Sequence, residues 1–206
     1  MKLVLATTNP HKVGEMRGIL GPLGVEVQGL DELGVTLPEP AETATTLEGN
    51  ARIKAVAYAR ALGQTCLADD SGLEVDALGG APGVHSARYA GISSTRDERD
   101  RRNREKLLAE LERRGPVSRA ARLVCSLCLA DATGRVLFET RGALEAVVAQ
   151  EPRGEHGFGY DSVLFLPDVQ KTLAELSAEE LNARSHRGTA ARALHAWLLN
   201  PSEALR

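Results

Sequence analysis

The chain has 206 residues, of which 43% are hydrophobic and 26% charged, a composition that is ordinary for a globular protein. Its net charge of −3 argues against a nucleic-acid partner, because nucleic-acid-binding proteins normally carry a basic face. No apolar run approaches the roughly 20 residues that a membrane span needs. The N-terminus also lacks the apolar segment of a signal peptide, so we expect a cytoplasmic protein with no membrane partner.

The first predicted element is a strand over residues 2–6, which a polar turn joins to a helix. Apolar residues at helical spacing indicate the helix, namely Val13, Met16, Ile19 and Leu20. Pro10 suits its first turn, with Asn9 or Thr8 as the cap. The free N–H groups and the helix dipole favour an anion at this turn, and Lys12 adds a positive charge. An ordinary capped turn is the alternative.

Residues 24–27 suggest a second strand, and residues 30–44, with two prolines and several acids, suggest a loop. Residues 47–62 are predicted to form a helix. The residues at helical spacing that indicate this helix are Ile53, Val56, Ala57, Arg60 and Ala61. Lys54 shares a face with Asn50 four residues earlier, and from the local pattern alone Lys54 is a solvated lysine.

Residues 65–68 predict a short buried strand, and Asp69 and Asp70 follow it in what we interpret as a turn. Open α/β sheets bind ligands at such strand ends. Two carboxylates about 5 Å apart repel by roughly 3 kcal/mol at an effective dielectric constant near 20. A divalent cation would relieve this repulsion, and oxygen ligands suit Mg²⁺. A turn in which both acids merely cap backbone N–H groups is an equal alternative.

A glycine-rich loop over residues 78–89 leads towards a charged helix over residues 96–114. Both signs of charge occur in the first half of this helix, which indicates a solvated face. Residues 119–131 and 136–149 read as two strands of a β-hairpin. Cys125 and Cys128 lie in the first of them, and residues three apart on a strand face opposite sides. We therefore expect neither a disulfide nor a shared metal, but buried, inert thiols.

Phe158 and Tyr160 fall in a glycine-rich turn of a chain with only 3% aromatic residues, which suggests a surface for stacking on a ring; a packed corner is the alternative. Ser185 is a plausible cap of the last helix. His186 and Arg187 would then be exposed at its N-terminus, where positive charge opposes the helix dipole. This suggests an anionic or polar ligand, with plain surface exposure as the alternative.

Together these elements predict one α/β domain over residues 1–206, with a mixed β-sheet, flanking helices and two lobes. The chain resembles the inosine triphosphate pyrophosphatase family, also called dITP/XTP or non-standard purine NTP pyrophosphatases. Four blocks in the family's order carry the resemblance, which covers residues 2–199: residues 7–12, 68–73, 157–161 and 185–188.

The resemblance implies an elongated mixed sheet with the active-site cleft between two lobes, in a protein that is usually a homodimer. It also implies Mg²⁺-dependent hydrolysis of ITP, dITP and XTP to the nucleoside monophosphate and pyrophosphate, which cleanses the nucleotide pool. By the same resemblance, Asp70 is the catalytic base and a Mg²⁺ ligand, and Glu42 is the second metal ligand. Asp69 is an additional candidate for the metal shell.

The resemblance further implies the contacts with a purine nucleoside triphosphate. The residues expected to hold its phosphates are Thr7, Thr8, Asn9, Pro10, His11, Lys12 and Lys54. Ser71 matches another substrate contact. The residues expected to bracket the base and sugar are Phe158, Gly159, Tyr160 and Asp161, and those expected to read the base edge are His186 and Arg187.

Three positions depart from the family pattern. Leu181 stands where a substrate-contacting lysine is usual, Arg184 where an apolar residue is common, and Ser162 where proline is frequent. One alternative function is a Maf-like pyrophosphatase that acts on other modified or pyrimidine nucleotides. Another is a non-catalytic nucleotide-binding module, against which the Glu42 and Asp70 pair argues.

Overall fold

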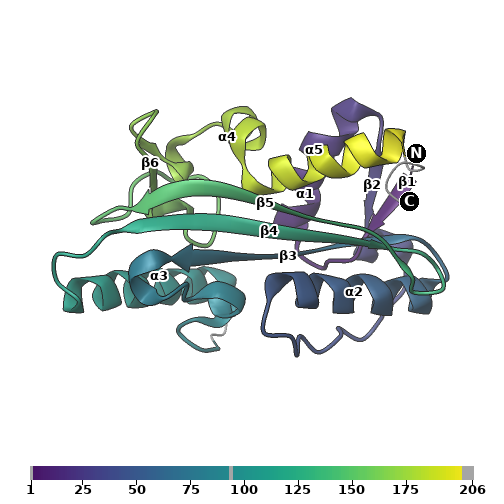
Figure 1. Cartoon of the computed structure of the whole chain (residues 1–206), viewed down its shortest axis with the longest axis horizontal. Helices are drawn as coiled ribbons and strands as arrows, with labels where there is room; N and C mark the ends of the chain where they lie inside the picture. Colours follow the sequence, from purple (N-terminus) through teal and green to yellow (C-terminus); the bar gives the residue numbers. More distant parts are fainter. Residues whose placement is uncertain (1, 93–94, 201–206) are drawn as a thin grey trace. The chain divides into compact units, whose positions relative to one another are not determined.

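The computed structural model describes residues 2–92 and 95–200, and the predicted domain also includes residues 1, 93–94 and 201–206, which lie outside them. Within the described part, seven strands form one sheet in the order β2-β1-β3-β4-β5-β6-β7 (Figure 1). The strands are β1 (Lys2–Leu5), β2 (Glu26–Gly29), β3 (Cys66–Val75), β4 (Ala120–Ala130), β5 (Val136–Val148), β6 (Leu164–Leu166) and β7 (Lys171–Thr172). The helices are α1 (Pro10–Leu20), α2 (Leu47–Leu62), α3 (Arg96–Arg113), α4 (Ala178–Arg184) and α5 (His186–Leu199).

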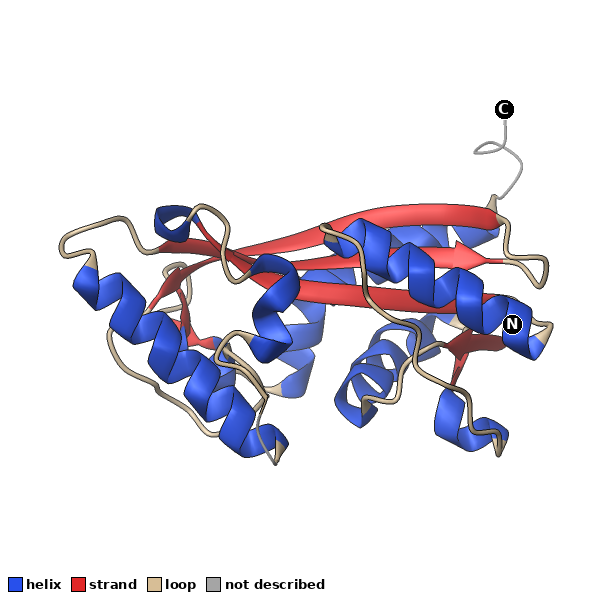
Figure 2. Ribbon diagram, turned by 90° about the horizontal axis from the view of Figure 1, so that it is seen from below, coloured by secondary structure: helices blue, strands red, loops and turns tan. Residues whose placement is uncertain are grey.

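The sheet is mixed, as predicted. β1 pairs in parallel with β2 and β3, whereas β6 pairs antiparallel with β5 and β7. Figure 2 shows the strands and the helices that flank them from a second direction. No helix in the described ranges combines the length and apolar character needed to cross a bilayer.

The chain divides into two compact units, each with its own core. Of the described residues, unit 1 comprises residues 2–70, 125–143 and 182–200, and unit 2 comprises the remainder. Unit 2 buries Leu107 and Leu111 of α3 against residues of β3, β5 and β6. The two units agree with the predicted two lobes, while the assignment of the whole chain to one domain stays a prediction.

Unit 1 packs helices on both faces of its strands: α1 and α5 lie on one face and α2 on the other (Figure 1). Leu67 of β3 belongs to the cluster on the α1 and α5 face, whereas Cys66 and Ala68 belong to the cluster on the α2 face. Successive strand residues alternate between faces. The next two residues of β3, Asp69 and Asp70, therefore also lie on opposite faces.

The bounds of α2 agree with the prediction, and its buried residues differ from those whose helical spacing indicated the helix. The buried residues are Leu47, Asn50, Ala51, Lys54, Ala55, Tyr58 and Ala59. The residues whose spacing indicated the helix are partly exposed or exposed, namely Ile53, Val56, Ala57, Arg60 and Ala61. Small alanines allow α2 to approach the sheet, and Asn50 accepts a hydrogen bond from the Ala44 N–H at 3.0 Å. Contacts with other segments of the chain therefore bury a face of α2 that is partly polar.

The predicted burial of Cys125 and Cys128 is confirmed. Cys66, Cys125 and Cys128 are free and buried. Cys125 and Cys128 belong to clusters on opposite faces of the sheet, as the strand spacing requires. Burial raises the pKa of Cys66 to about 11 and is the main cause that raises the pKa of Cys128 to about 12.

Candidate active site

The paired acids lie inside β3, so the predicted turn after a short strand is wrong. β1 ends at Leu5, which pairs with Leu67, and β3 continues to Val75. β4 lies beside β3 in the sheet and supports this extension. Asp69 and Asp70 thus lie just past the carboxyl end of parallel strand β1, where α/β sheets place ligands. The acids thus lie at the carboxyl end of a strand, as predicted, although the strand that ends there is β1.

The polar turn between β1 and α1 has the predicted capped geometry. Asn9 is the N-cap, and its side chain accepts from the His11 N–H at 3.1 Å. The Asn9 N–H donates to Thr7 Oγ1 at 3.2 Å, and Pro10 opens the helix. Thr8, Pro10 and His11 are exposed. No acidic residue lies in the first turn of α1, so the positive end of its dipole is available to an anion.

On the α1 and α5 face of the sheet, Asp69 is part of a buried ion network. The Lys12 Nζ lies 2.9 Å from Asp69 Oδ2, and the Arg187 Nε lies 3.4 Å from the same oxygen. Arg187 Nη1 also donates to Glu15 Oε2 at 2.8 Å. Sequence reasoning missed Glu15, although its position three residues after Lys12 on α1 indicates a shared helix face. Two cations and two carboxylates are thereby joined.

The network changes the ionisation of Asp69. Burial opposes the charged form, but the charges of Lys12 and Arg187 outweigh it and hold the pKa of Asp69 well below its usual range. Burial also opposes the charge of Arg187, yet Glu15 and Asp69 raise its pKa. No metal ion is thus needed on this face to offset the predicted repulsion between Asp69 and Asp70, because Lys12 and Arg187 already compensate the charge of Asp69.

The predicted exposure of His186 and Arg187 is wrong. Their exposed fractions are 6% and 4%. Ser185 caps α5 as predicted, accepting from the Gly188 N–H at 2.9 Å. Burial, with the nearby charge of Arg187, lowers the pKa of His186 well below 6.5, so His186 is neutral at pH 7. The positive charge at this helix end is balanced by carboxylates of the protein itself.

On the α2 face of the sheet, Lys54 joins the two predicted metal ligands. Its Nζ lies 2.8 Å from Asp70 Oδ1 and 3.1 Å from Glu42 Oε1. Lys54 is 7% exposed, so its prediction as a solvated lysine is wrong. The loop before α2 carries Glu42, α2 carries Lys54 and β3 carries Asp70. Residues distant in sequence therefore meet around one ammonium group.

Burial raises the pKa of Asp70, against the opposing effect of Lys54. For Lys54, burial alone would lower the pKa, but the charges of Asp70 and Asp69 outweigh it and raise the pKa. Lys54 is therefore cationic at neutral pH. A carboxylate with a raised pKa accepts a proton more readily than an ordinary aspartate, which suits a general base.

The glycine-rich turn over residues 157–161 belongs to unit 2. Tyr160 is only 6% exposed and its hydroxyl donates to the Ser86 carbonyl oxygen at 2.9 Å, which for this ring agrees with the packed-corner alternative. Phe158 is partly exposed, and its N–H donates to Asp161 Oδ2 at 2.9 Å. Ser71, the other predicted contact in this unit, is also partly exposed.

Sequence reasoning also missed the contacts of the charged half of α3, which was predicted to be solvated. The Gly159 N–H donates to Asp100 Oδ2 at 3.0 Å, and Arg104 Nη1 donates to the Gly159 carbonyl oxygen at 2.7 Å. Arg101 and Glu105 do form an exposed pair, as expected of a solvated face. The helix thus has a solvated side and a side that binds a turn.

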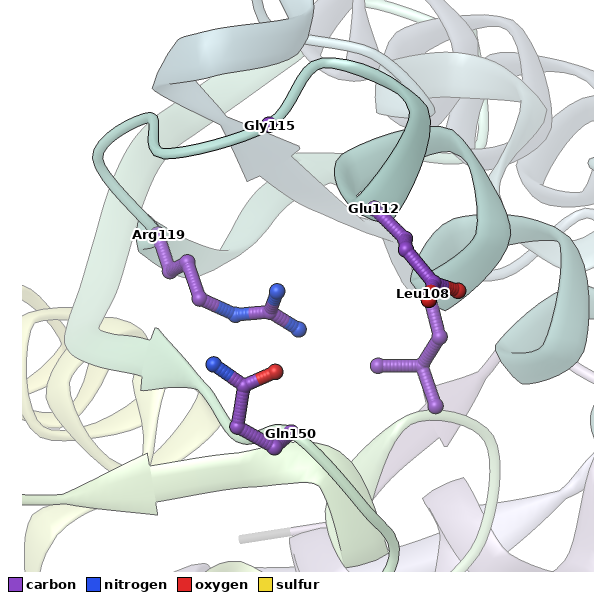
Figure 3. A pocket seen from close by; sticks show the side chains of 5 residues that line it. All are labelled: Leu108, Glu112, Gly115, Arg119 and Gln150. Carbon is purple, nitrogen blue, oxygen red and sulfur yellow. The ribbon is translucent and has the colours of Figure 1, made fainter.

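A hollow of about 350 Å³ in unit 2 is a separate feature. It is lined by Leu108, Glu112, Gly115, Arg119 and Gln150 (Figure 3). The Arg119 Nε and Nη2 donate to the carbonyl oxygens of Val148 and Ala149, both at 2.7 Å. The guanidinium therefore fixes the end of β5, and the lining contains none of the predicted site residues.

Together, the open mixed sheet, the capped helix turn and the buried acids and lysines define an α/β protein suited to phosphate-bearing ligands. The Ham1 family model matches residues 3–197, and the chain belongs to this family. The predicted resemblance is therefore confirmed.

The chain is similar to a dITP/XTP pyrophosphatase of an Exiguobacterium species, with 48% identity over 97% of each chain. A Bacillus subtilis relative of the same name is 45% identical over 93% of each chain. Among solved structures, a HAM1 protein from Coxiella burnetii has a TM-score of 0.85 and 39% identity, covering 97% of this chain and 98% of its own. A nucleoside-triphosphatase from Mycobacterium abscessus has a TM-score of 0.73 and 38% identity, covering 94% and 98%.

Proposed function

We propose that this protein hydrolyses dITP, ITP and XTP to the nucleoside monophosphate and pyrophosphate. The observation that carries the proposal is the group of buried Asp70 and Lys54 with partly buried Glu42, beyond the carboxyl end of β1. The relatives named dITP/XTP pyrophosphatase, at 45% and 48% identity over nearly the whole chain, support the choice of nucleotide.

In this proposal, Asp70 accepts a proton from a water molecule while the water oxygen attacks phosphorus. The α–β anhydride bond breaks, and pyrophosphate leaves. Lys12 and Lys54 donate to phosphate oxygens and stabilise their growing charge, which is most of what phosphoryl transfer requires. The first turn of α1 holds the phosphates through its N–H groups together with Thr7, Thr8 and His11.

The site residues fit a magnesium ion. Glu42 and Asp70 each direct a carboxylate oxygen at the Lys54 ammonium, so two oxygen donors already converge on one cation. Among the described residues, no group of three or more His, Cys, Asp or Glu side chains is placed to hold a metal. Two carboxylates are sufficient in this proposal, because Mg²⁺ is commonly held by one or two carboxylates together with substrate phosphates and water. When bound, the ion would neutralise phosphate charge and lower the pKa of water.

For the base, the proposal assigns stacking to Phe158, since the Tyr160 ring is buried in the core. Gly159 and Asp161 would contact the base and sugar, and Ser71 the substrate. His186 and Arg187 would read the base edge. The 6-oxo group of hypoxanthine or xanthine accepts hydrogen bonds, whereas the 6-amino group of adenine donates them. Donor groups of the protein would therefore lack an acceptor when ATP binds, which disfavours ATP. We also propose that the protein is a cytoplasmic homodimer.

Pyrophosphate release from dITP, ITP, XTP, GTP, ATP, dTTP and UTP, each with and without Mg²⁺, tests this function. We expect turnover of the deaminated purines to exceed that of ATP by about 10⁴-fold, the scale on which a site built to hydrogen-bond its substrate rejects an analogue that cannot make the bond. Chelation of Mg²⁺ should abolish turnover of the deaminated purines. Cleavage of dTTP or UTP at least as fast as dITP would instead favour the Maf-like alternative.

A further inference from the structure

One face of α3 binds both polar backbone groups of Gly159. Asp100 accepts from the Gly159 N–H at 3.0 Å, and Arg104 donates to its carbonyl oxygen at 2.7 Å. The two side chains are four residues apart on the helix, so they lie on one face. Both hydrogen bonds involve an ionised group and are of the stronger kind. This pair, Asp100 and Arg104, is called the α3 clamp below.

The turn held by the α3 clamp has little freedom of its own. Gly157 and Gly159 have φ angles of +78° and +61°, which favour glycine. A Cβ atom on Gly157 would lie 2.2 Å from Asp161 Oδ2, the oxygen that accepts from the Phe158 N–H. Tyr160 is fixed from the other side through Ser86. Phe158, between the two glycines, is thus a partly exposed ring on a firmly held backbone.

The same helix also holds the segment that binds Tyr160. Asn103 is 2% exposed and lies between the two clamp residues in sequence. Its Nδ2 donates to the carbonyl oxygens of Ser86 and Ala87 at 3.2 and 3.3 Å. Its Oδ1 accepts from the Ala90 N–H at 2.7 Å. Because Asn103 fixes this segment independently, removal of the clamp should leave the core of unit 2 intact.

We propose that the α3 clamp positions Phe158 for stacking on the purine ring. The inference rests on the proposed function, in which Phe158 contacts the base. A ring held in its bound orientation loses less conformational entropy when the ligand binds, so preorganisation increases affinity. The clamp residues act through the turn, which makes them positioning residues rather than catalytic ones. Their loss should weaken binding of the base while leaving proton transfer at Asp70 unchanged.

The test compares Asp100→Ala and Arg104→Met with the wild-type enzyme. We expect the KM for dITP to rise about tenfold in each variant, the scale of one lost charge-assisted hydrogen bond, with kcat changed less than about threefold. Inhibition by inorganic tripolyphosphate, which has no base, should be unchanged. Asp100→Asn keeps an acceptor for the Gly159 N–H and should restore most of the affinity for dITP.

Arg101→Met is the matched control. It removes an ion pair of the same i,i+4 spacing from α3, with Arg101 and Glu105 2.7 Å apart and both more than half exposed. This variant should keep the wild-type KM. A further comparison uses Phe158→Ala, alone and combined with Asp100→Ala. If the clamp acts through Phe158, loss of Asp100 should add less than about twofold once the ring is gone, because residues that act as one unit are not additive.

The outcomes separate the two proposals. If wild-type protein hydrolyses dITP but both clamp variants keep its KM, the clamp inference is overturned and the proposed function stands. An equal loss of affinity for tripolyphosphate, or full additivity with Phe158→Ala, also overturns it, because the clamp would then have a general structural role. If wild-type protein neither binds nor hydrolyses dITP, the proposed function fails and the inference falls with it.

Discussion

Asp69 and Asp70 are adjacent in sequence, yet the two faces of β3 give them different surroundings. On the α1 and α5 face, Asp69 is 1% exposed, pairs with Lys12 and shares Arg187 with Glu15. On the α2 face, Asp70 shares Lys54 with Glu42. The pKa of Asp69 is lowered because the charges of Lys12, Arg187 and Lys54 outweigh its burial, and the pKa of Asp70 is raised because burial outweighs its one close lysine.

The difference indicates two separate roles. A carboxylate with a strongly lowered pKa is a poor proton acceptor but a good partner for buried cations. One with a raised pKa, beside a second carboxylate, suits proton transfer and metal binding. We therefore expect Asp69 to contribute mainly to folding and to the placement of Lys12 and Arg187, and Asp70 mainly to chemistry. Substitution of each residue by its amide tests this contrast.

The largest expected effect is the loss of turnover in Asp70→Asn. Without the carboxylate, the attacking water loses its base, and a positioned base contributes roughly 10²–10⁴-fold to rate. We expect kcat for dITP to fall about 10³-fold, as measured by pyrophosphate release. The melting temperature should change less than in Asp69→Asn, because Glu42 still lies 3.1 Å from Lys54. Full turnover in Asp70→Asn would contradict the assignment of this residue as the base.

The second expected effect is the loss of stability in Asp69→Asn. This change removes the negative charge that balances Lys12 and Arg187. Breaking an ion pair in a buried site costs about 3 kcal/mol or more. Urea denaturation measures the free energy of unfolding, with Asp70→Asn as the control on the opposite face. If both amides reduced stability equally, the two carboxylates would not have separate roles.

The smallest of these effects is expected for Glu15→Gln. The amide oxygen can still accept from Arg187, and Asp69 continues to balance the guanidinium, so the loss should be about 1 kcal/mol. The same denaturation assay measures it. A loss as large as that of Asp69→Asn would place the main compensation of Arg187 at Glu15 and so weaken the contrast between the two faces of β3.

Much of the fold was predictable because local signals and tertiary packing agree. The apolar spacing of α1 matches its buried residues Val13, Met16, Ile19 and Leu20. The bounds of α2 and the hairpin strands also agree closely with the prediction. The buried side of α2 was not predictable, because the polar face that carries Asn50 and Lys54 is buried only where Ala44, Glu42 and Asp70 supply partners.

The candidate site was predictable as a set of residue types, but not as a set of pairs. The resemblance identified Asp70, Glu42, Lys54 and Lys12 as residues of interest. It did not indicate that Arg187 would be buried against Glu15, because those residues are 172 positions apart. It also gave no signal for the α3 clamp, since charged residues at the start of a helix ordinarily face water.

The sequence by itself determined the class of fold, the family and the chemical groups available to a phosphate-bearing ligand, since these depend on local periodicity and on motifs in order. Only the tertiary structure decided which charges compensate one another. The alternation of β3 separates Asp69 from Asp70, and the helices packed on each face bring a different lysine to each carboxylate. Those contacts, together with burial, determine which aspartate is suited to act as a base.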